Sequence, residues 1–214
     1  MSFYNNNISG GIPTEIGTLP KLQTLRIRHQ SITGDIPESV WNITTLTELS
    51  LSNNQMTATI SPSIRNLINL KYLDLRNCRL FGEIPSEIGE CVGLTNMVLS
   101  YNQLTGCIPP TIGKLFRLQY LSLRNNRLTG CIPPTFGSMV ALKHLYLNDN
   151  ASLNGTLPSS ISKLDSLVAI NLNNTLVEKV IPANMDPESC LFKLLAKQGF
   201  QDTCSRPPKV LNWK

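Results

Sequence analysis

The sequence predicts a repeat solenoid of the α/β class, with a parallel β-sheet along one side and short helical turns along the other. Two observations predict this fold. Leucine recurs at positions 22, 46, 70, 94, 118, 142 and 167, in five equal intervals followed by one that is a single residue longer. One template, L-x-x-L-x-L-x-x-N-x-L-x-G-x-I-P-x-x-I-G-x-L-x-x, fills each interval and is clearest over residues 118–141. A single unit of this kind cannot bury its own apolar face, so consecutive units must stack.

The first part of each template predicts a short strand with one buried face. Pairs such as Leu49/Leu51 and Leu73/Leu75 alternate with polar residues at a period of two. An asparagine then recurs at one register, where a buried amide can bond to backbone groups of the turn that leaves the strand. The asparagines are Asn6, Asn54, Asn102, Asn126 and Asn150, and Gln30, Cys78 and Thr175 stand at the same register in other repeats.

The second part of the template predicts a bend and then a helical turn. The Gly-x-Ile-Pro segment, as at Gly82–Pro85, needs unusual backbone angles, and the following Ile/Leu pair packs a short turn on the outer side. The repeats lose the template after Pro182. We therefore expect a solenoid of about eight repeats over residues 1–182, the first one incomplete, and a helical cap with a tail over 183–214.

The C-terminal segment predicts one capping helix. Asp186-Pro187 is typical of an N-cap and first helical residue, and Gly199 is typical of a helix end. Between them an apolar helical face is formed by Cys190, Leu191, Leu194 and Leu195.

The L-x-G-x-I-P bend and the repeats around it resemble the plant-type leucine-rich-repeat family over residues 1–182. This resemblance implies a right-handed solenoid with a concave parallel β-sheet, short convex 3-10 or helical turns and a C-terminal capping helix. It implies a non-catalytic protein similar to receptor-kinase ectodomains, receptor-like proteins and polygalacturonase-inhibiting proteins. The family's C-terminal caps often carry a cysteine pair, for which Cys190 and Cys204 are the candidates. The family's N-terminal cap is not present, so we expect that N-terminal repeats or a cap are missing.

Composition excludes several other classes. The net charge of 19 − 14 = +5 is too mild to indicate a nucleic-acid partner, and no apolar run is long enough to form a membrane span. The sequence has two histidines, no CxxC pair and none of the common catalytic motifs, so we expect no metal, no cofactor and no enzyme activity.

The cysteines and glycosylation motifs bear on location. Cys78 and Cys91 occupy core registers, whereas Cys107 and Cys131 stand one full repeat apart and could be either two exposed thiols or a disulfide between neighbouring repeats. Candidate N-glycosylation sites are Asn7, Asn42 and Asn154; Asn150 should be buried, and a glycan on Asn173 would obstruct the sheet. These features favour an extracellular or cell-surface protein, with an intracellular one as the alternative.

The outward strand positions hold the candidate binding residues. All five tyrosines and both histidines fall there, and arginine recurs in every second repeat at 28, 76 and 124. Tyrosine and arginine dominate binding hot spots. The predicted ligand-binding residues are Arg26, Arg28, His29, Tyr72, Asp74, Arg76, Tyr101, Tyr120, Arg124, His144 and Tyr146.

Two details sharpen this prediction. Arg26 and Arg28 put two guanidiniums on one face, where they could clamp a carboxylate or sulfate, and they resemble the R-x-R pair that peptide-hormone receptors of this family use for a terminal carboxylate. Tyr72, Tyr101, Tyr120 and Tyr146 could form an aromatic platform for a peptide or sugar chain.

The sequence thus favours a module that binds a protein or peptide on its concave face. The alternatives are an inhibitor of a secreted wall-degrading enzyme, an intracellular scaffold or substrate-recruiting arm of a larger protein, and a fragment without autonomous function.

Overall fold

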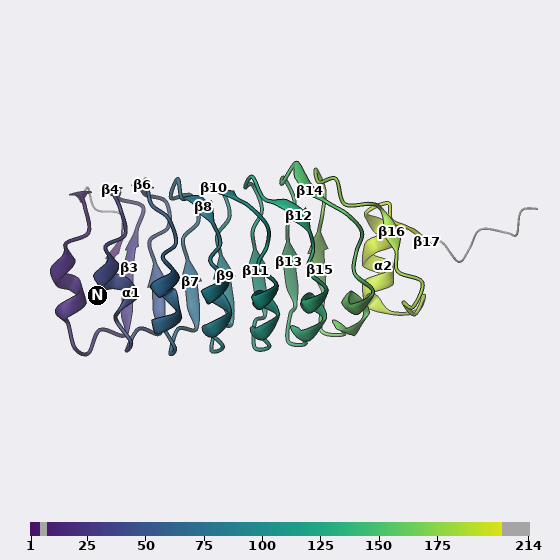
Figure 1. The fold of residues 1–214 in the computed structure, drawn as a ribbon, viewed down its shortest axis with the longest axis horizontal. Coiled ribbons are helices and arrows are strands. Elements are labelled where there is room, and N and C mark those ends of the chain that lie inside the picture. The colour runs from purple at the N-terminus through teal and green to yellow at the C-terminus, as the bar shows by residue number, and fades with distance from the viewer. Residues whose placement is uncertain (5–7, 203–214) are drawn as a thin grey trace, which may run out of the picture.

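The computed structural model describes residues 1–4 and 8–202 and is a leucine-rich-repeat solenoid, as predicted. One strand from each repeat joins a parallel sheet of eight strands, and the strands follow one another in sequence order along the long axis (Figure 1). The strands are β1 (Ser2–Tyr4), β3 (Thr24–Arg28), β5 (Glu48–Ser50), β7 (Tyr72–Asp74), β9 (Asn96–Val98), β11 (Tyr120–Ser122), β13 (His144–Tyr146) and β15 (Ala169–Asn171).

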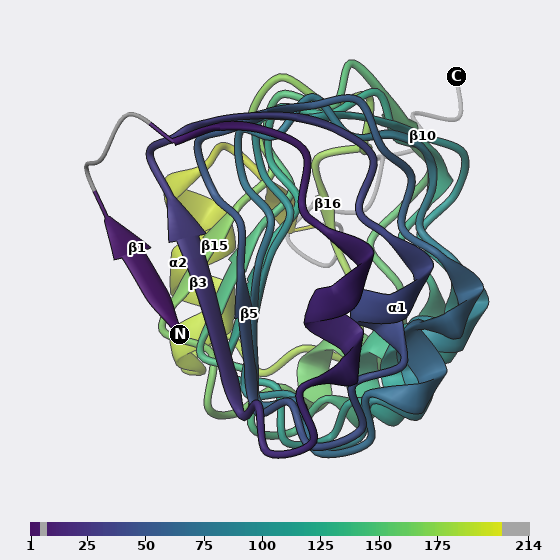
Figure 2. The ribbon, with the colours of Figure 1, turned by 90° about the vertical axis from the view of Figure 1, so that its left-hand side faces the viewer.

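Short helical turns line the side opposite the sheet (Figure 2). Buried apolar side chains from both sides form one core cluster. Glycine lets neighbouring turns approach closely: a Cβ on Gly113 would lie 2.5 Å from the Thr135 carbonyl oxygen. This explains the Ile-Gly step of the template. The turns are η1 (Thr14–Thr18), α1 (Glu38–Trp41), η2 (Pro62–Asn66), η3 (Ser86–Glu90), η4 (Pro110–Lys114), η5 (Pro134–Ser138) and η6 (Ser159–Lys163).

Besides the main sheet and the helical turns, each repeat has a short strand after its asparagine position, and these strands together are here called the outer strip. Partners on this strip are closer in the sequence than one full repeat, so Cys107 lies opposite Thr129 and not opposite Cys131. Cys107 and Cys131 are therefore not direct partners, and both are exposed free thiols. Aligning the repeats with one another suggested that Cys107 and Cys131 share a register, because that alignment assumes that paired residues are one full repeat apart. The strands are β2 (Ser9–Gly10), β4 (Ser31–Gly34), β6 (Gln55–Met56), β8 (Phe81–Glu83), β10 (Gln103–Thr105), β12 (Thr129–Cys131) and β14 (Ser152–Asn154).

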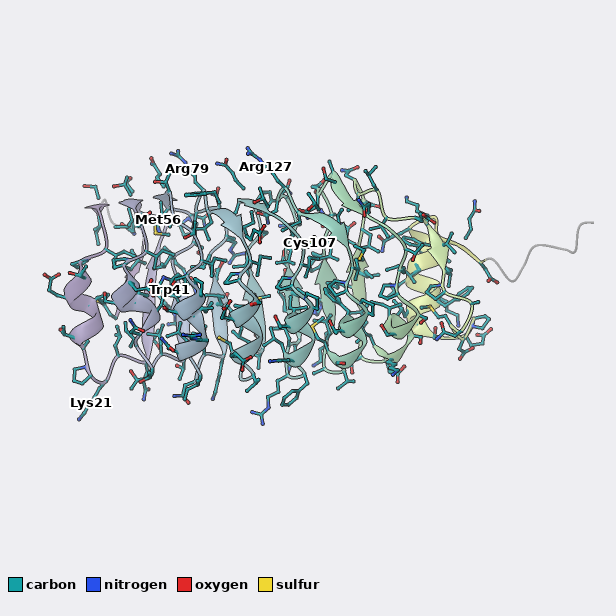
Figure 3. All side chains as sticks on the ribbon, in the orientation of Figure 1. Lys21, Trp41, Met56, Arg79, Cys107 and Arg127 are labelled. Atoms are coloured by element: carbon teal, nitrogen blue, oxygen red, sulfur yellow. The ribbon has the colours of Figure 1, made fainter. Side chains whose placement is uncertain are left out.

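The interior combines leucine packing with buried amides. The core leucines, Trp41, Cys78 and Cys91 are fully buried, and side chains fill the space between sheet and turns (Figure 3). Asn102 illustrates the amide position. Its Nδ2 donates to the carbonyls of Leu75 and Leu99 at 2.8 and 3.0 Å, and its Oδ1 accepts from the backbone N–H groups of Cys78 and Leu80 at 3.0 Å each. The amide thus bonds to backbone groups around the turn, as predicted, and it also joins two consecutive repeats.

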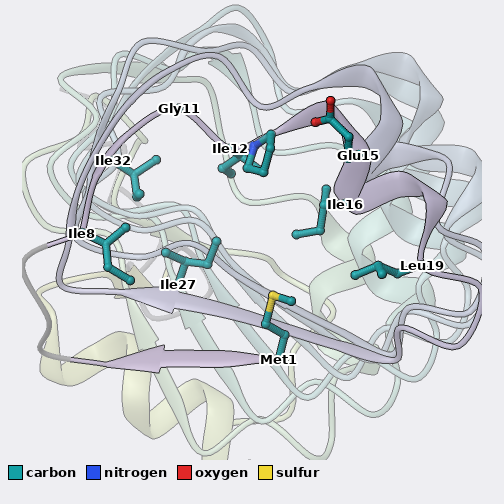
Figure 4. Close-up of a pocket in the computed structure, with 10 residues that line it drawn as sticks. Met1, Ile8, Gly11, Ile12, Glu15, Ile16, Leu19, Ile27 and Ile32 are labelled. Carbon is teal, nitrogen blue, oxygen red and sulfur yellow. The ribbon is translucent and has the colours of Figure 1, made fainter.

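The first repeat leaves the apolar interior open at one end. A cavity of about 400 Å³ lies there, lined mainly by isoleucines such as Ile12, Ile16 and Ile27. These side chains converge with Met1 on the open end of the solenoid (Figure 4).

Helix α2 (Cys190–Lys197) covers the other end, where it contacts β15 and β16 (Val180–Ile181). Its N-cap is Ser189, whose Oγ accepts from the backbone N–H of Phe192, so the predicted start at Asp186-Pro187 was wrong. Asp186 instead accepts from the N–H of Glu188 in the turn before the helix. Gly199 ends the helix in the left-handed region, as predicted.

The cap also provides hydrogen-bond partners for backbone groups of the last strand of the main sheet. Gln198, at the end of α2, accepts from the N–H of Leu172 and donates to the carbonyl of Ile170, which is the role a neighbouring repeat plays elsewhere. Strand β17 (Gln201–Asp202) then pairs with β16. Cys190 is exposed at the start of α2 and does not lie on its buried face, while Cys204 lies outside the described residues.

Candidate functional site

The outward side of the eight-stranded sheet, here called the sheet face, aligns side chains from different repeats. Parallel pairing keeps equivalent positions side by side: Tyr72 pairs with Asn96, Asn96 with Tyr120, and Tyr120 with His144. Residues one repeat apart in the sequence are therefore direct neighbours, about 4.8 Å apart at the backbone. The predicted residues gather on this face into three groups.

The first group, at the N-terminal end, is an ion-pair network around Glu48. Arg26 donates to both Glu48 carboxylate oxygens through Nε and Nη2, and Arg28 reaches Glu48 Oε1 at 3.1 Å. The hydrogen bond with Glu48 raises the pKa of Arg26. The guanidinium of Arg28 also lies 5.9 Å from the ring centroid of Tyr72. The Arg26–Arg28 pair is thus already bound to a carboxylate of its own chain, which a ligand carboxylate would have to displace.

The second group surrounds a hollow of about 480 Å³, here called the central hollow. Four predicted residues line it, together with two asparagines that the sequence analysis did not single out. The guanidinium of Arg124 lies 4.9 Å from the ring centroid of Tyr101, within the range of a cation–π contact. The lining residues are His29, Asn53, Arg76, Asn77, Tyr101 and Arg124.

Asp74 lies beneath this hollow and does not line it. Its side chain is fully buried, although the sequence pattern predicted a ligand contact. Its Oδ2 accepts from Arg76 Nη2 at 3.0 Å and its Oδ1 from the backbone N–H of Arg76. Because Asp74 is fully buried, it can hold Arg76 in place but cannot reach a ligand. Ser50 and Ser122 of the same column are buried in the same way.

A ladder of residues with positive φ borders the central hollow. Seven consecutive repeats place one such residue shortly after the strand, and most of these are Asn, Asp or His, which tolerate this backbone region best. Asn77 donates to Asn53 Oδ1 at 2.9 Å, and Asn174 donates to Asp149 Oδ1. The ladder consists of His29, Asn53, Asn77, Tyr101, Asn125, Asp149 and Asn174.

The third group is an aromatic cluster near the C-terminal end, formed by Tyr120, His144 and Tyr146. The ring of Tyr120 lies 5.6 Å from those of both His144 and Tyr146, and His144 and Tyr146 are 6.4 Å apart. Burial raises the pKa of Tyr120, and Tyr146 adds to the shift. The expected platform of four tyrosines is therefore divided, since Tyr72 lies beside Arg28 and Tyr101 beside Arg124.

The remaining candidates concern modification. Asn42 and Asn154 are exposed, and Asn173 is exposed at the sheet, whereas Asn150 is fully buried. Asn42 already accepts a hydrogen bond from Asn66 at 2.8 Å. Asn7 lies outside the described residues.

Neither a metal centre nor a membrane span is found in the described part of the chain. Residues 1–4 and 8–202 contain no group of three or more His, Cys, Asp and Glu residues that could hold a metal ion. Within the same residues, no helix has the length and apolarity needed to span a bilayer.

Comparison with known proteins places these features in a family. Models of leucine-rich repeats match residues 44–87, 93–115 and 116–177. No curated protein sequence matches the chain.

Similar solved structures include plant receptors. The plant peptide hormone receptor RGFR1, in complex with RGF2, is 37% identical with a TM-score of 0.81 over 83% of this chain. The Arabidopsis receptor kinase HAESA, in complex with the peptide hormone IDA and the co-receptor SERK1, is 32% identical with a TM-score of 0.72 over 86% of this chain. The chain spans only 28% of the first and 34% of the second. A plant ice-binding protein is 25% identical with a TM-score of 0.61, over 83% of this chain and 72% of its own.

Proposed function

The chain belongs to the plant-type leucine-rich-repeat family, and from that premise we infer that it is a non-catalytic recognition module that binds an extended peptide or protein segment across its sheet face. The observation that carries this proposal is the gathering of arginine, tyrosine and histidine on one face, as two adjacent groups around the central hollow and the aromatic cluster. These residue types dominate binding hot spots because they combine large contact area with directional polar groups.

The structural relatives support a peptide as the ligand. RGFR1 and HAESA were each solved with a peptide hormone, and both are plant receptors. The relatives also support a location outside the cell, where glycans on Asn42 and Asn154 would lie away from the sheet face. A disulfide between Cys190 and Cys204 belongs to the same proposal.

The outer strip favours peptide binding over an ice-binding role. Exposed threonines recur there at 33, 57, 105 and 129, one per repeat. Exposed Phe81 interrupts the threonine column, and Arg79 and Glu83 place charges on either side of it. A surface that matches a crystal lattice must be regular, and this strip is not.

A displayed library of random linear dodecapeptides, selected on the immobilised full chain, tests the proposal. The selected peptides should lose at least tenfold in affinity for a Tyr120→Ala/Tyr146→Ala variant, because truncating one hot-spot residue costs about 2 kcal/mol. The matched control is Phe81→Ala/Phe116→Ala, which removes two aromatic rings that are exposed elsewhere on the molecule. Failure to select any peptide, or an equal loss of affinity in both variants, would refute the proposal.

A further inference from the structure

The central hollow carries a positive charge that the described part of the chain does not fully neutralise. Arg76 and Arg124 both line it. No described carboxylate forms an ion pair with Arg124, whereas Arg26 and Arg28 share Glu48. Among the described carboxylates, Arg76 is bonded to Asp74 alone, which is fully buried behind it while the Arg76 side chain stays 45% exposed. Asp74 thus fixes Arg76 in place and leaves its outer edge open to a ligand.

Tyr101, which also lines the central hollow, is the one bulky aromatic residue of the positive-φ ladder defined above. Its φ of 57° is unfavourable for a bulky side chain, and the neighbouring ladder positions on both sides are asparagines. Its side chain is 46% exposed, so burial of the ring does not explain the choice of residue. Backbone strain of this kind concentrates at functional sites.

Tyr101 and Arg124 are held together in two ways. The backbone N–H of Tyr101 donates to the carbonyl of Arg124 at 3.0 Å, and the Tyr101 ring lies under the guanidinium. The ring therefore positions Arg124 over the hollow. Arg76 and Arg124 belong to repeats on either side of the repeat of Tyr101, so their backbones are about 10 Å apart, which long side chains can bridge around one anion.

We propose that the hollow between Arg76, Tyr101 and Arg124 binds the carboxylate of an Asp or Glu side chain of an extended peptide, and that the adjacent aromatic cluster binds an apolar or aromatic side chain of the same peptide. This proposal rests on the proposed function and specifies the ligand class. Two guanidiniums can give a carboxylate charge-assisted hydrogen bonds in a site that is partly shielded from water.

The geometry also specifies the spacing of the two peptide side chains. Arg76 and Arg124 lie on either side of the repeat of β9, and the aromatic cluster lies between β11 and β13, one and a half strands further on. At ~4.8 Å per strand this is about 7 Å across the sheet, and Arg124 lies four residues beyond Tyr120 in the same repeat, which adds ~13 Å along the strand direction. The two sites are thus about 15 Å apart, and an extended peptide advances ~3.4 Å per residue. The acidic residue and the apolar residue should therefore lie about four positions apart in the peptide.

Parallel selections of random linear dodecapeptides on three full-length proteins test this site. They are the unmodified chain, Arg76→Gln/Arg124→Gln, and the control Arg79→Gln/Arg127→Gln. The control removes the same charge from two exposed arginines, likewise two repeats apart, that project from the outer strip (Figure 3). The unmodified chain and the control should enrich an acidic residue about four positions from an apolar one, and the Arg76/Arg124 variant should lose that enrichment at least tenfold.

A second variant separates binding from folding. Tyr101→Asn places a residue suited to positive φ at this position, so it should fold at least as well as the unmodified chain. It should still weaken binding of the selected acidic peptides at least tenfold, because Arg124 loses its support.

The outcomes distinguish the two proposals. Selected peptides without acidic residues, or an acidic preference that survives in the Arg76/Arg124 variant or in Tyr101→Asn, would overturn the acidic site and leave the proposed function standing. A failure to select any peptide on the unmodified chain would overturn both.

Discussion

Replacing Asn102 by leucine tests whether buried amides hold the repeats together. The asparagine is nearly fully buried, and leucine has a similar volume, so the change removes hydrogen bonds without opening a large cavity. Two backbone N–H groups, those of Cys78 and Leu80, lose the Oδ1 acceptor that they share. The carbonyl of Leu75 loses its bond from Nδ2, while that of Leu99 keeps a second donor, Asn126.

The expected cost follows from these three groups. Each buried polar group left without a partner costs about 1–3 kcal/mol. Some relaxation of the loop will recover part of this, so we expect the free energy of unfolding to fall by roughly 3–5 kcal/mol. That is a large fraction of the total stability of a domain, which is about 5–15 kcal/mol.

Two measurements check this prediction. Urea unfolding followed by circular dichroism gives the change in stability, and hydrogen exchange reports on the amides of Cys78 and Leu80 directly. The control is Asn69→Ala, which removes a single exposed bond to the carbonyl of Thr44 and should cost less than ~1 kcal/mol. A loss below ~1 kcal/mol for Asn102→Leu, or unchanged exchange at both amides, would show that the amides are not structural ties.

Three further predictions follow from particular contacts. Tyr101→Asn should raise stability by about 0.5–1 kcal/mol in urea unfolding, because relief of positive φ outweighs the lost cation–π contact; a destabilised variant would show that Tyr101 is not strained. Burial raises the pKa of Cys78 and of Cys91 to about 12. Both thiols should therefore stay protonated and resist iodoacetamide at pH 8.5 until the protein is unfolded, while the exposed thiols react. Peptide mapping that finds Cys78 or Cys91 alkylated in the native protein would contradict this. Gly113→Ala should lower the thermal midpoint by several degrees, a cost of about 1–3 kcal/mol, since the added methyl group meets the Thr135 carbonyl; an unchanged midpoint would show that neighbouring turns can separate freely.

The site was partly predictable from the sequence. Period-two alternation placed most of the tyrosines and His144 at outward strand positions, the shared repeat register placed His29 and Tyr101 just after their strands, and parallel in-register pairing then made their neighbours predictable. Exposure was not predictable, because it depends on how the surrounding side chains pack over each position: Asp74 points outward and is still fully buried. The importance of Glu48 was missed for a similar reason, since its partners Arg26 and Arg28 come from the preceding repeat.

The sequence by itself determined the leucine-rich-repeat fold, the strand, bend and turn within each unit, and the buried asparagine that follows each strand. Each of these depends on local geometry repeated at a constant interval, so one template contains it. Only the tertiary structure showed that paired residues on the outer strip are fewer positions apart in the sequence than one full repeat, and that Ser189 is the N-cap of the capping helix. Only the structure showed, too, that Arg124 has no carboxylate partner among the described residues, whereas Arg26 and Arg28 share one. These depend on distances between side chains of different repeats, which vary with the particular residues at each position and are not specified by the template that the repeats share.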